Sequence, residues 1–326
     1  MRNESDPCPC GSGEVYKACC EPYHDGRLPE NALKLMRSRY AAYALNLPKY
    51  LIQTTHPASP QFHSDIGRWA AMIADFCRHT QFTKLEVLSF QEQGSFAVVT
   101  FTAHLTQNKQ DASFTERSYF EKIKGKWLYR SGLLADGHAP HLITTGQIKV
   151  LPLAYYGDPI LRKVAEPITA FNDDLRTLVD EMIETMDAYD GVGLAAPQVH
   201  HSVQVFVIRV LKEEEGKVVP KGIKVMINPV IADPSAENWK IPEACLSIPT
   251  FQGEVERPQE ITVEYSDVEG NRIQERISGW EARIVQHEND HLNGVLFIDR
   301  LSEEEKKAIK PSLEQLRKRI HESLQM

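Results

Sequence analysis

Residues 280–294 read WEARIVQHENDHLNG, and this stretch decides both the fold and the chemistry of the second half of the chain. The pattern predicts a helix from Trp280 to Leu292 that stops at Gly294. Residues four apart lie on one face of a helix, so His287 and His291 can hold one metal ion, and Glu288 can lie beside a metal-bound water. The His-Glu-x-x-His pattern also arises by chance on solvated helices. Two imidazoles also do not complete a catalytic metal site, which typically has three protein ligands.

Cys245 is the candidate for that third ligand. It lies in the stretch Glu243-Ala244-Cys245-Leu246-Ser247, which we expect to be a proline-flanked loop between strands. A thiolate there would give a two-His, one-Cys site that leaves one position for water. The alternative is a buried, inert cysteine, because most lone cysteines only fill the core.

A glycine-rich segment, GVGLAAPQ, occupies residues 191–198. Its first six residues match G-x-G-x-x-A, the dinucleotide-binding pattern, which requires a strand before it and a helix after it. Here the predicted order is reversed, since a helix precedes the segment and Pro197 and a strand follow it. We interpret the segment as a glycine loop that allows close backbone approach and ends in Gln198, whose amide can donate a hydrogen bond.

The motifs YGDPILR, GVGLAAPQ, EACLS and HENDHLNG follow in this order, and residues 149–302 thereby resemble peptide deformylase. The resemblance implies an α+β fold with an antiparallel sheet around the motif helix, and removal of the formyl group from N-formylmethionine of new bacterial polypeptides. It implies that Cys245, His287 and His291 bind the metal and that Glu288 is the general acid/base. The oxyanion donors it implies are Gln198 and the backbone N–H of Leu246. Ala244 departs from the family, which commonly has glycine there.

The implied mechanism is metal-assisted hydrolysis. A divalent ion lowers the pKa of its bound water from about 15.7 toward 7, and Glu288 would pass the water proton to the departing amine. The resemblance implies Fe²⁺, although Zn²⁺, Ni²⁺ and Co²⁺ would accept the same ligands. For the substrate we expect contacts from the glycine loop and from an apolar slot, made by Gly191, Val192, Gly193, Trp280 and Ile284. The alternative for Trp280 and Ile284 is that they pack in the core.

Four cysteines lie within 13 residues near the start of the chain: Cys8, Cys10, Cys19 and Cys20. This density predicts a closed tetrahedral Zn²⁺ site of structural type, with Gly11 and Gly13 in a tight turn. Unrelated thiols or two disulfides are the alternative.

The rest of the first half predicts helices followed by strands. Helical spacing covers residues 29–48 and 65–79, and strand-like stretches cover 84–92, 95–106, 113–123 and 126–131, an α+β arrangement. CPCGSGEVYKACC and LMRSRYAAYALNLPKYLIQTTHP make residues 7–135 resemble the YchJ-like family. That family joins a zinc-binding SEC-C motif to a cone-shaped domain of the nuclear transport factor 2-like fold, and it implies no reaction.

We therefore expect five segments: a SEC-C-like zinc motif (1–27), a YchJ-like α+β domain (28–135), a linker (136–148), a deformylase domain (149–302) and a helical tail (303–326). The length of 326 residues fits two domains.

Composition excludes several classes of function. No run of about 18 apolar residues could span a membrane, and the polar start has no signal peptide, so we expect a cytoplasmic protein. The net charge is -8, and residues 149–326 carry 21 Lys and Arg against 31 Asp and Glu. This charge balance disfavours DNA as a partner, because phosphate binding needs a concentrated positive face.

Two other functions remain open from the sequence. One is a zinc endopeptidase, whose third ligand is normally a downstream His or Glu, although only His321 follows His291. The other is a zinc-dependent adaptor with an inactive deformylase half. SEC-C motifs resemble protein-docking modules, so we hypothesise that the first half recruits the enzyme to the ribosome or to a nascent-chain factor.

Overall fold

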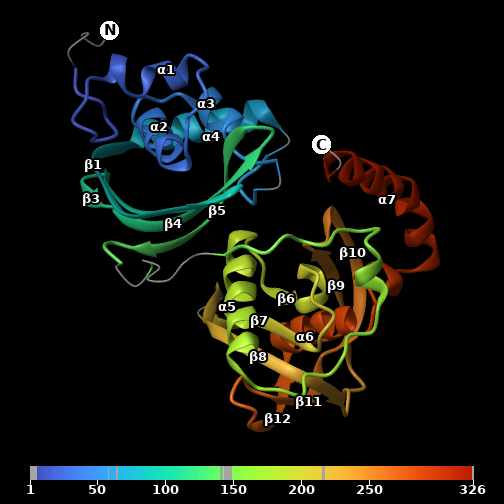
Figure 1. The fold of residues 1–326 in the computed structure, drawn as a ribbon. Coiled ribbons are helices and arrows are strands. Elements are labelled where there is room, and N and C mark those ends of the chain that lie inside the picture. Colours follow the sequence, from blue (N-terminus) through green and yellow to red (C-terminus); the bar gives the residue numbers. More distant parts are fainter. Residues whose placement is uncertain are drawn as a thin grey trace. The chain divides into compact units, whose positions relative to one another are not determined.

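The structure is a computed structural model and describes residues 6–57, 59–63, 65–139, 142, 149–214 and 217–324. It divides into two compact units (Figure 1). The first comprises Met1–Lys149 with Asp187–Asp190, and the second comprises Val150–Met186 with Gly191–Met326. Most of the predicted linker, residues 136–148, lies outside the described residues.

The first unit begins with the cysteine-rich segment. It contains a 3-10 turn, η1 (Tyr16–Ala18), and a short helix, α1 (Glu21–His24). Gly11 and Gly13 have φ angles of 68° and 87°, which is the left-handed region that favours glycine. The turn lets the amide of Cys8 donate to the carbonyl of Glu14 at 2.8 Å. The predicted tight turn is therefore confirmed.

Three helices follow: α2 (Ala32–Ala44), α3 (Pro48–Gln53) and α4 (Ile66–His79). The single helix expected over 29–48 is interrupted, because Asn46 adopts a left-handed φ of 53° just before Pro48. Asp65 caps α4, since its side chain accepts a hydrogen bond from the amide of Arg68.

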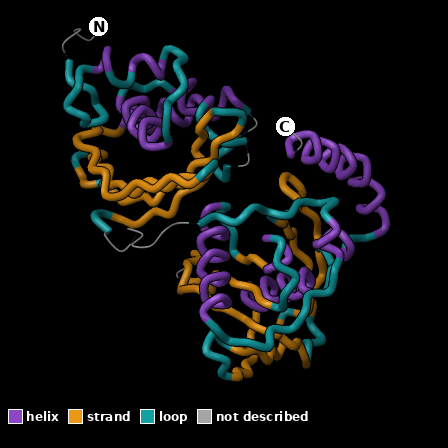
Figure 2. Tube along the Cα trace, viewed as in Figure 1, coloured by secondary structure: helices purple, strands orange, loops and turns teal. Residues whose placement is uncertain are grey.

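The strands of this unit form one antiparallel sheet in the order β1-β2-β4-β5, and β3 pairs with β2. The helices lie against the concave face of this curved sheet (Figures 1 and 2). Lys124 and Gly125 both have positive φ, which matches the predicted hairpin turn. This arrangement confirms the expected α+β class. The strands are β1 (Thr80–Gln93), β2 (Phe96–Gln107), β3 (Gln110–Asp111), β4 (Phe114–Ile123) and β5 (Lys126–Asp136).

The second unit is also α+β. Its larger sheet has the order β12-β11-β8-β7-β6, and β9 and β10 form a separate antiparallel pair. The strands are β6 (Gly193–Ala195), β7 (Val205–Glu214), β8 (Lys217–Ala232), β9 (Asn238–Cys245), β10 (Ile248–Pro258), β11 (Glu260–Ser266) and β12 (Arg272–Ser278). The helices and 3-10 turns are η3 (Pro159–Arg162), α5 (Asp173–Ala188), η4 (Ala196–Val199), α6 (Gly279–Leu292), η5 (Phe297–Arg300) and α7 (Glu303–Leu324).

The motif helix α6 lies in the middle of this unit, where Figure 1 shows it surrounded by strands. Its Val285 packs in an apolar cluster with Phe206 and Val263 of the larger sheet. The helix ends at Leu292, and Gly294 follows with a φ of 68°, as the sequence predicts. Between Ala282 and Leu292, every residue of α6 except Asn289 is buried. The helix can therefore hold side chains away from bulk water.

A further sequence expectation, that Cys245 lies in a loop, is also wrong. Cys245 does not lie in a loop, because it is the last residue of strand β9, and Leu246 and Ser247 form the tight turn that leads to Ile248. The proline at position 242 suggested a loop, yet both strands of a two-stranded sheet are edge strands, where proline is tolerated. The glycine-rich segment likewise contains strand β6 and the turn η4.

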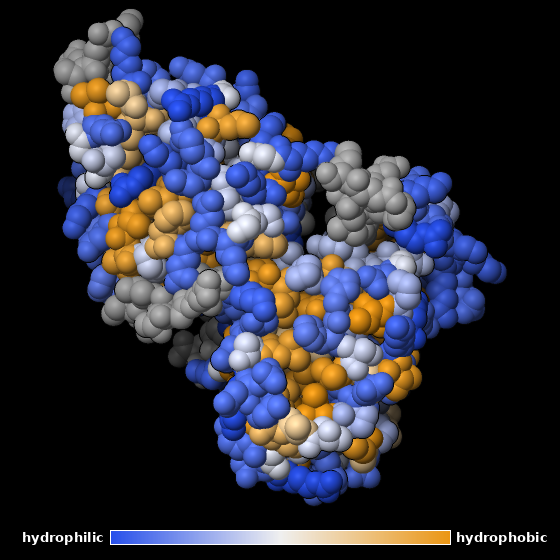
Figure 3. All heavy atoms as spheres, viewed as in Figure 1, coloured by the Kyte–Doolittle hydropathy of each residue, from blue (hydrophilic) through white to orange (hydrophobic). Residues whose placement is uncertain are grey.

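Within the described part of the chain, every helix is too short or too polar to cross a membrane. On the face drawn in Figure 3, each unit shows hydrophobic patches among hydrophilic side chains.

Candidate metal centre

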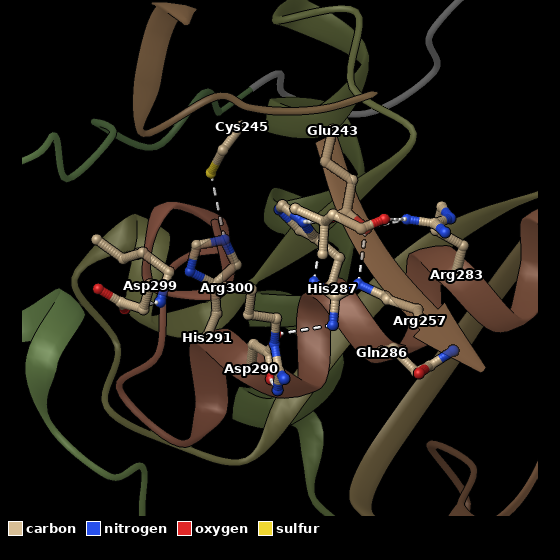
Figure 4. Close-up of polar contacts among 12 residues, drawn as sticks. Glu243, Cys245, Arg257, Arg283, Gln286, His287, Asp290, His291, Asp299 and Arg300 are labelled. Carbon is tan, nitrogen blue, oxygen red and sulfur yellow. Dashed lines mark hydrogen bonds and ion pairs between the residues drawn. The ribbon is translucent and has the colours of Figure 1, made fainter. Parts of the chain in front are cut away.

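Strand β9 and helix α6 bring three metal-ligating side chains together. The sulfur of Cys245 and the ring nitrogens of His287 and His291 lie within 4.8 Å of one another, and all three residues are buried. Cys245 Sγ is 3.3 Å from His291 Nε2, a contact marked in Figure 4. The helix supplies two donors from one face, and the strand end supplies the third from the opposite side.

The spacing of these donors fits a small divalent ion. Metal–sulfur and metal–nitrogen bonds of about 2.3 and 2.0 Å around a tetrahedral ion place sulfur and nitrogen roughly 3.5 Å apart, close to the 3.3 Å seen between Cys245 and His291. His287 directs its Nδ1 to Glu243, so its Nε2 is the nitrogen left for a metal. The residues present therefore fit a Cys-His-His metal site with room for a further ligand.

Glu243 orients His287 from two residues before Cys245. Its carboxylate accepts from His287 Nδ1 at 2.9 Å, from Arg257 at 2.6 and 2.9 Å, and from Arg283 at 2.6 Å. Burial acts to raise the pKa of Glu243, but hydrogen bonds from Arg257 and His287 outweigh it and hold this pKa well below its usual range. A charged carboxylate on the outer nitrogen fixes the ring orientation and makes the ligand more basic.

The charges continue from Glu243 as a series that alternates in sign, and Figure 4 labels its members. Arg257, with 2% of its surface exposed, bridges Glu243 and Asp290, and it reaches the latter at 2.8 Å. Asp290 also accepts two hydrogen bonds of 2.5 Å from Arg300. These five residues, which we call the ion-pair series, are Arg283, Glu243, Arg257, Asp290 and Arg300. They tie α6 to β9 and β10.

Sequence reasoning did not assign Glu243 a role. Side chains two apart on a strand share one face, so Glu243 lies on the same side of β9 as Cys245. The two-residue spacing of Glu243 and Cys245 is visible in the sequence, but it indicates a shared face only in a strand, and the sequence predicts a loop there.

Glu288 lies beside the ligands with 4% of its surface exposed. Its Oε2 has no hydrogen-bond partner among the described residues, and burial raises the pKa of this carboxyl to about 7. A Cβ built on Gly193 would lie 2.7 Å from Glu288 Cδ, a distance that real Cβ atoms essentially never show. The second glycine of the GVG segment thus leaves room for the carboxyl, which agrees with the close approach inferred from the sequence.

Gln198 places an amide group at the same site. Its Oε1 accepts a hydrogen bond from the Ala195 amide at 2.8 Å, so its Nε2 must face the opposite way. That nitrogen lies 3.2 Å from Ser247 Oγ and 3.5 Å from Cys245 Sγ. The amide is therefore anchored on one side and presents its donor beside a metal ligand.

The residues expected to contact the substrate lie in different surroundings. Val192 and Trp280 are 46% and 40% exposed, and Trp280 packs edge-on against Trp239. Ile284 is buried in the core cluster of the larger sheet. Gly191 lies close to Leu246, because a Cβ built there would approach the Leu246 side chain at 3.0 Å.

A second group of donors lies in the first unit. The sulfur atoms of Cys8, Cys10, Cys19 and Cys20 lie within 4.8 Å of one another. Cys19 Sγ is 3.5 Å from Cys10 Sγ and 3.8 Å from Cys20 Sγ. Bonds of about 2.3 Å around a tetrahedral Zn²⁺ place sulfurs roughly 3.8 Å apart, so this cluster could bind a metal. All six cysteines are free, which contradicts the disulfide alternative.

Comparison with known proteins agrees with both halves of this description. Residues 150–307 match the family model for polypeptide deformylase. Residues 31–132 match the middle NTF2-like domain of YchJ, and residues 5–22 match the SEC-C motif.

Individual relatives cover the second unit. Peptide deformylase of Thermotoga sp. (strain RQ2) is 46% identical over 147 residues, which are 45% of this chain and 84% of that protein. The crystal structure of the Thermotoga maritima deformylase is 44% identical and covers 47% of this chain and 98% of its own, with a TM-score of 0.43. A Met-Ala-Ser-bound deformylase of Acinetobacter baumannii is 39% identical over 47% of this chain and 98% of its own, with a TM-score of 0.44. On the family-model matches, on the 46% identity to the Thermotoga sp. (strain RQ2) protein and on its Cys-His-His site, the chain belongs to the peptide deformylase family, with a SEC-C motif and a YchJ-type NTF2-like domain before the deformylase domain.

Proposed function

We propose that this chain removes the formyl group from N-formylmethionine at the start of nascent polypeptides. The observation that carries the proposal is the buried Glu288 carboxyl next to the Cys245, His287 and His291 donors, whose Oε2 has no hydrogen-bond partner among the described residues. Metal-assisted hydrolysis of an amide uses an ion that activates water and a group that moves the water proton. The side chains that could hold the ion and the carboxyl that could move the proton lie in one buried place. Formate release from formyl-Met-Ala-Ser tests the proposal.

Cys245, His287 and His291 would hold the ion, for which we propose Fe²⁺ in the cell. Zn²⁺, Ni²⁺ and Co²⁺ suit the same donors, since affinity alone does not select among them. When bound, the ion supplies a Lewis acid that makes hydroxide available near neutral pH.

Glu288 is the proposed general acid/base. Burial keeps its pKa near 7, so the carboxyl can both accept and return a proton close to neutral pH. It would take the proton of the attacking water and deliver it to the amide nitrogen as the bond to the formyl carbon breaks. An amide nitrogen leaves poorly unless it is protonated.

Gln198 and the backbone N–H of Leu246 are the proposed oxyanion donors. The Gln198 amide is held in place by Ala195, and Leu246 follows Cys245 directly in the turn after β9. Pre-positioned donors of this kind each stabilise the transition state by about 3 kcal/mol in comparable sites.

For the methionine side chain, we propose a slot whose walls include Val192 and Trp280, with Gly191 and Gly193 beside the peptide backbone. The two larger side chains are partly exposed and so are accessible to a substrate. Ile284 can contribute only from within the core.

Gly193→Ala is expected to lower kcat/KM about a hundredfold, because displacing a catalytic group by about 1 Å has an effect of this size. The new Cβ would overlap the Glu288 carboxyl. Steady-state kinetics with formyl-Met-Ala-Ser measure the change. Gly67→Ala on α4 is the control, since a Cβ there meets only Asp65 Oδ1 at an ordinary 3.5 Å. Equal kinetics for Gly193→Ala and the wild type would show that Glu288 does not work from its present position.

For the first half of the chain, we propose a zinc motif at residues 1–27, an NTF2-like domain at 28–135 and a linker at 136–148. The deformylase domain would then span 149–302, and the helical tail 303–326.

We further propose that the first half recruits the enzyme to the ribosome or to a nascent-chain factor, because the substrate emerges there. Support comes from the match to the SEC-C motif and from the four clustered thiols.

Replacing Cys10 and Cys20 together with serine is expected to remove one bound zinc per chain and to weaken co-sedimentation with ribosomes. The kcat on a free tripeptide should remain unchanged, because the deformylase site has its own ligands. Metal analysis, sedimentation and kinetics of the full-length proteins test this, with Cys77→Ser as a control at a buried cysteine outside the cluster. Unchanged sedimentation after zinc loss would refute recruitment through this motif.

A further inference from the structure

The NTF2-like domain encloses a cavity of about 470 Å³ between its helices and the concave face of its sheet. Sites for small molecules commonly have volumes of roughly 300–1,000 Å³. The cavity lies within the first unit and is lined by none of the deformylase site residues. The cavity is therefore a separate place from the metal centre.

Aromatic side chains form a large part of the cavity wall. Six of the lining rings are Tyr40, Tyr43, Trp69, Phe82, Phe101 and Phe114. The lining also includes Met72, Phe76 and Leu134, which are 50%, 39% and 60% exposed. Apolar side chains thus lead from the surface into the interior, which gives an apolar molecule a path of entry.

A few polar side chains also line the cavity. Glu116 accepts a hydrogen bond of 2.5 Å from Ser118, and Arg39 donates to the Leu51 carbonyl at 2.9 Å while it stacks over the Tyr129 ring at 4.8 Å. Burial raises the pKa of Glu116, although hydrogen bonds from Ser118 and Tyr129 act to lower it. Both side chains already have hydrogen-bond partners within the protein.

Gly132 provides the space for this carboxyl. A Cβ built at that position would lie 2.8 Å from Glu116 Cδ and 2.9 Å from the Tyr129 hydroxyl. The polar group is therefore accommodated by a residue without a side chain, as expected of a built site rather than of a packing defect.

Tyr40 supplies the observation that points to a ligand. It lines the cavity and is 6% exposed, yet its hydroxyl has no hydrogen-bond partner among the described residues. A buried hydroxyl without a partner costs about 1–3 kcal/mol, and such groups in native proteins call for an explanation. A ligand that carries a hydroxyl would supply the missing partner.

We propose that this cavity binds a small, uncharged, mainly apolar molecule with one hydroxyl group, which exchanges a hydrogen bond with the Tyr40 hydroxyl. The aromatic walls favour a ring or a compact hydrocarbon body. A charged ligand is disfavoured, because a largely apolar lining cannot replace the water that a charge loses on burial.

Thymol and p-cymene test the proposal, because they share one carbon skeleton and differ only in a hydroxyl group. Full-length protein is loaded with Nile red, a neutral dye that fluoresces in apolar surroundings, and each compound is titrated to displace it. Wild-type protein is expected to release the dye to both compounds. In Tyr40→Phe, the Kd of thymol should rise about fivefold or more, the size expected for one hydrogen bond, while the Kd of p-cymene stays unchanged.

Tyr119→Phe is the matched control, because it removes a buried tyrosine hydroxyl that is not part of the cavity lining. It should leave both Kd values as they are. Ala103→Leu fills the cavity from β2 and should weaken binding of both compounds at least tenfold. Tyr40→Phe removes no hydrogen bond seen among the described residues, so its melting temperature should not fall. This variant decides the question even if Ala103→Leu does not fold. Absence of displacement from wild-type protein, or equal thymol affinity in Tyr40→Phe and Tyr119→Phe, would overturn the proposal.

Discussion

Glu288→Gln is expected to lower kcat/KM for formyl-Met-Ala-Ser by about 10³-fold while the catalytic metal remains bound, a loss within the range typical of general acid/base groups. Glutamine has the shape of the carboxyl but cannot take up the proton of water. The ligand atoms belong to Cys245, His287 and His291, so the change removes none of them. Anaerobic kinetics together with metal analysis of the same samples measure the effect.

Glu281→Gln is the control for this variant, because it makes the same change on the same helix. Glu281 lies in the first turn of α6 and pairs with Lys224. It should retain near wild-type kinetics. If Glu288→Gln kept more than a tenth of wild-type kcat/KM, proton transfer by Glu288 would be refuted. Activity loss that tracks loss of metal would instead assign Glu288 to holding the ion.

Glu243→Ala is expected to have the largest effect on stability. It leaves the buried Arg257 and Arg283 guanidinium groups without their shared anion, and removing one partner of a buried ion pair costs about 3–5 kcal/mol. His287 also loses the acceptor on its outer nitrogen, and removal of such partners typically lowers metal affinity about 10- to 100-fold. Urea unfolding, followed separately for each unit, measures the first effect, and competition with a chelator measures the second.

Glu254→Ala controls for a general effect of removing a carboxylate from this two-stranded sheet. Glu254 pairs with Lys240 on the surface, where both side chains are about half exposed. Exposed pairs contribute about 0–1 kcal/mol. A Glu243→Ala protein within 1 kcal/mol of the wild type would contradict the account of the ion-pair series.

The motif helix shows how far the sequence could be interpreted. Spacing of four residues on a helix is a local property, so His287 and His291 could be placed on one face without any knowledge of the fold. The hairpin turn at Lys124-Gly125 and the glycine turn at Gly11 and Gly13 were predictable for the same reason, since they depend on backbone conformations that few residues adopt.

The surroundings of that helix could not be predicted in the same way. Glu243 and Asp290 are far apart in sequence, and their connection through Arg257 depends on how β9, β10 and α6 pack. The prolines near Cys245 predict a loop around that residue, and only the pairing of β9 with β10 shows that Cys245 ends a strand. The cavity of the NTF2-like domain arises from sheet curvature, a tertiary property that no single segment encodes.

Product analysis with a formylated peptide tests the central claim most directly. Full-length protein, purified without oxygen and loaded with Fe²⁺, is incubated with formyl-Met-Ala-Ser, with the Glu288→Gln protein in parallel. Formate is quantified, and the peptides are identified by mass spectrometry. The account predicts that the wild type releases one formate for each intact Met-Ala-Ser formed and that the variant releases formate about 10³-fold more slowly. Cleavage of the peptide bonds instead would indicate an endopeptidase, and absence of any product from protein with a full complement of metal would leave the adaptor function.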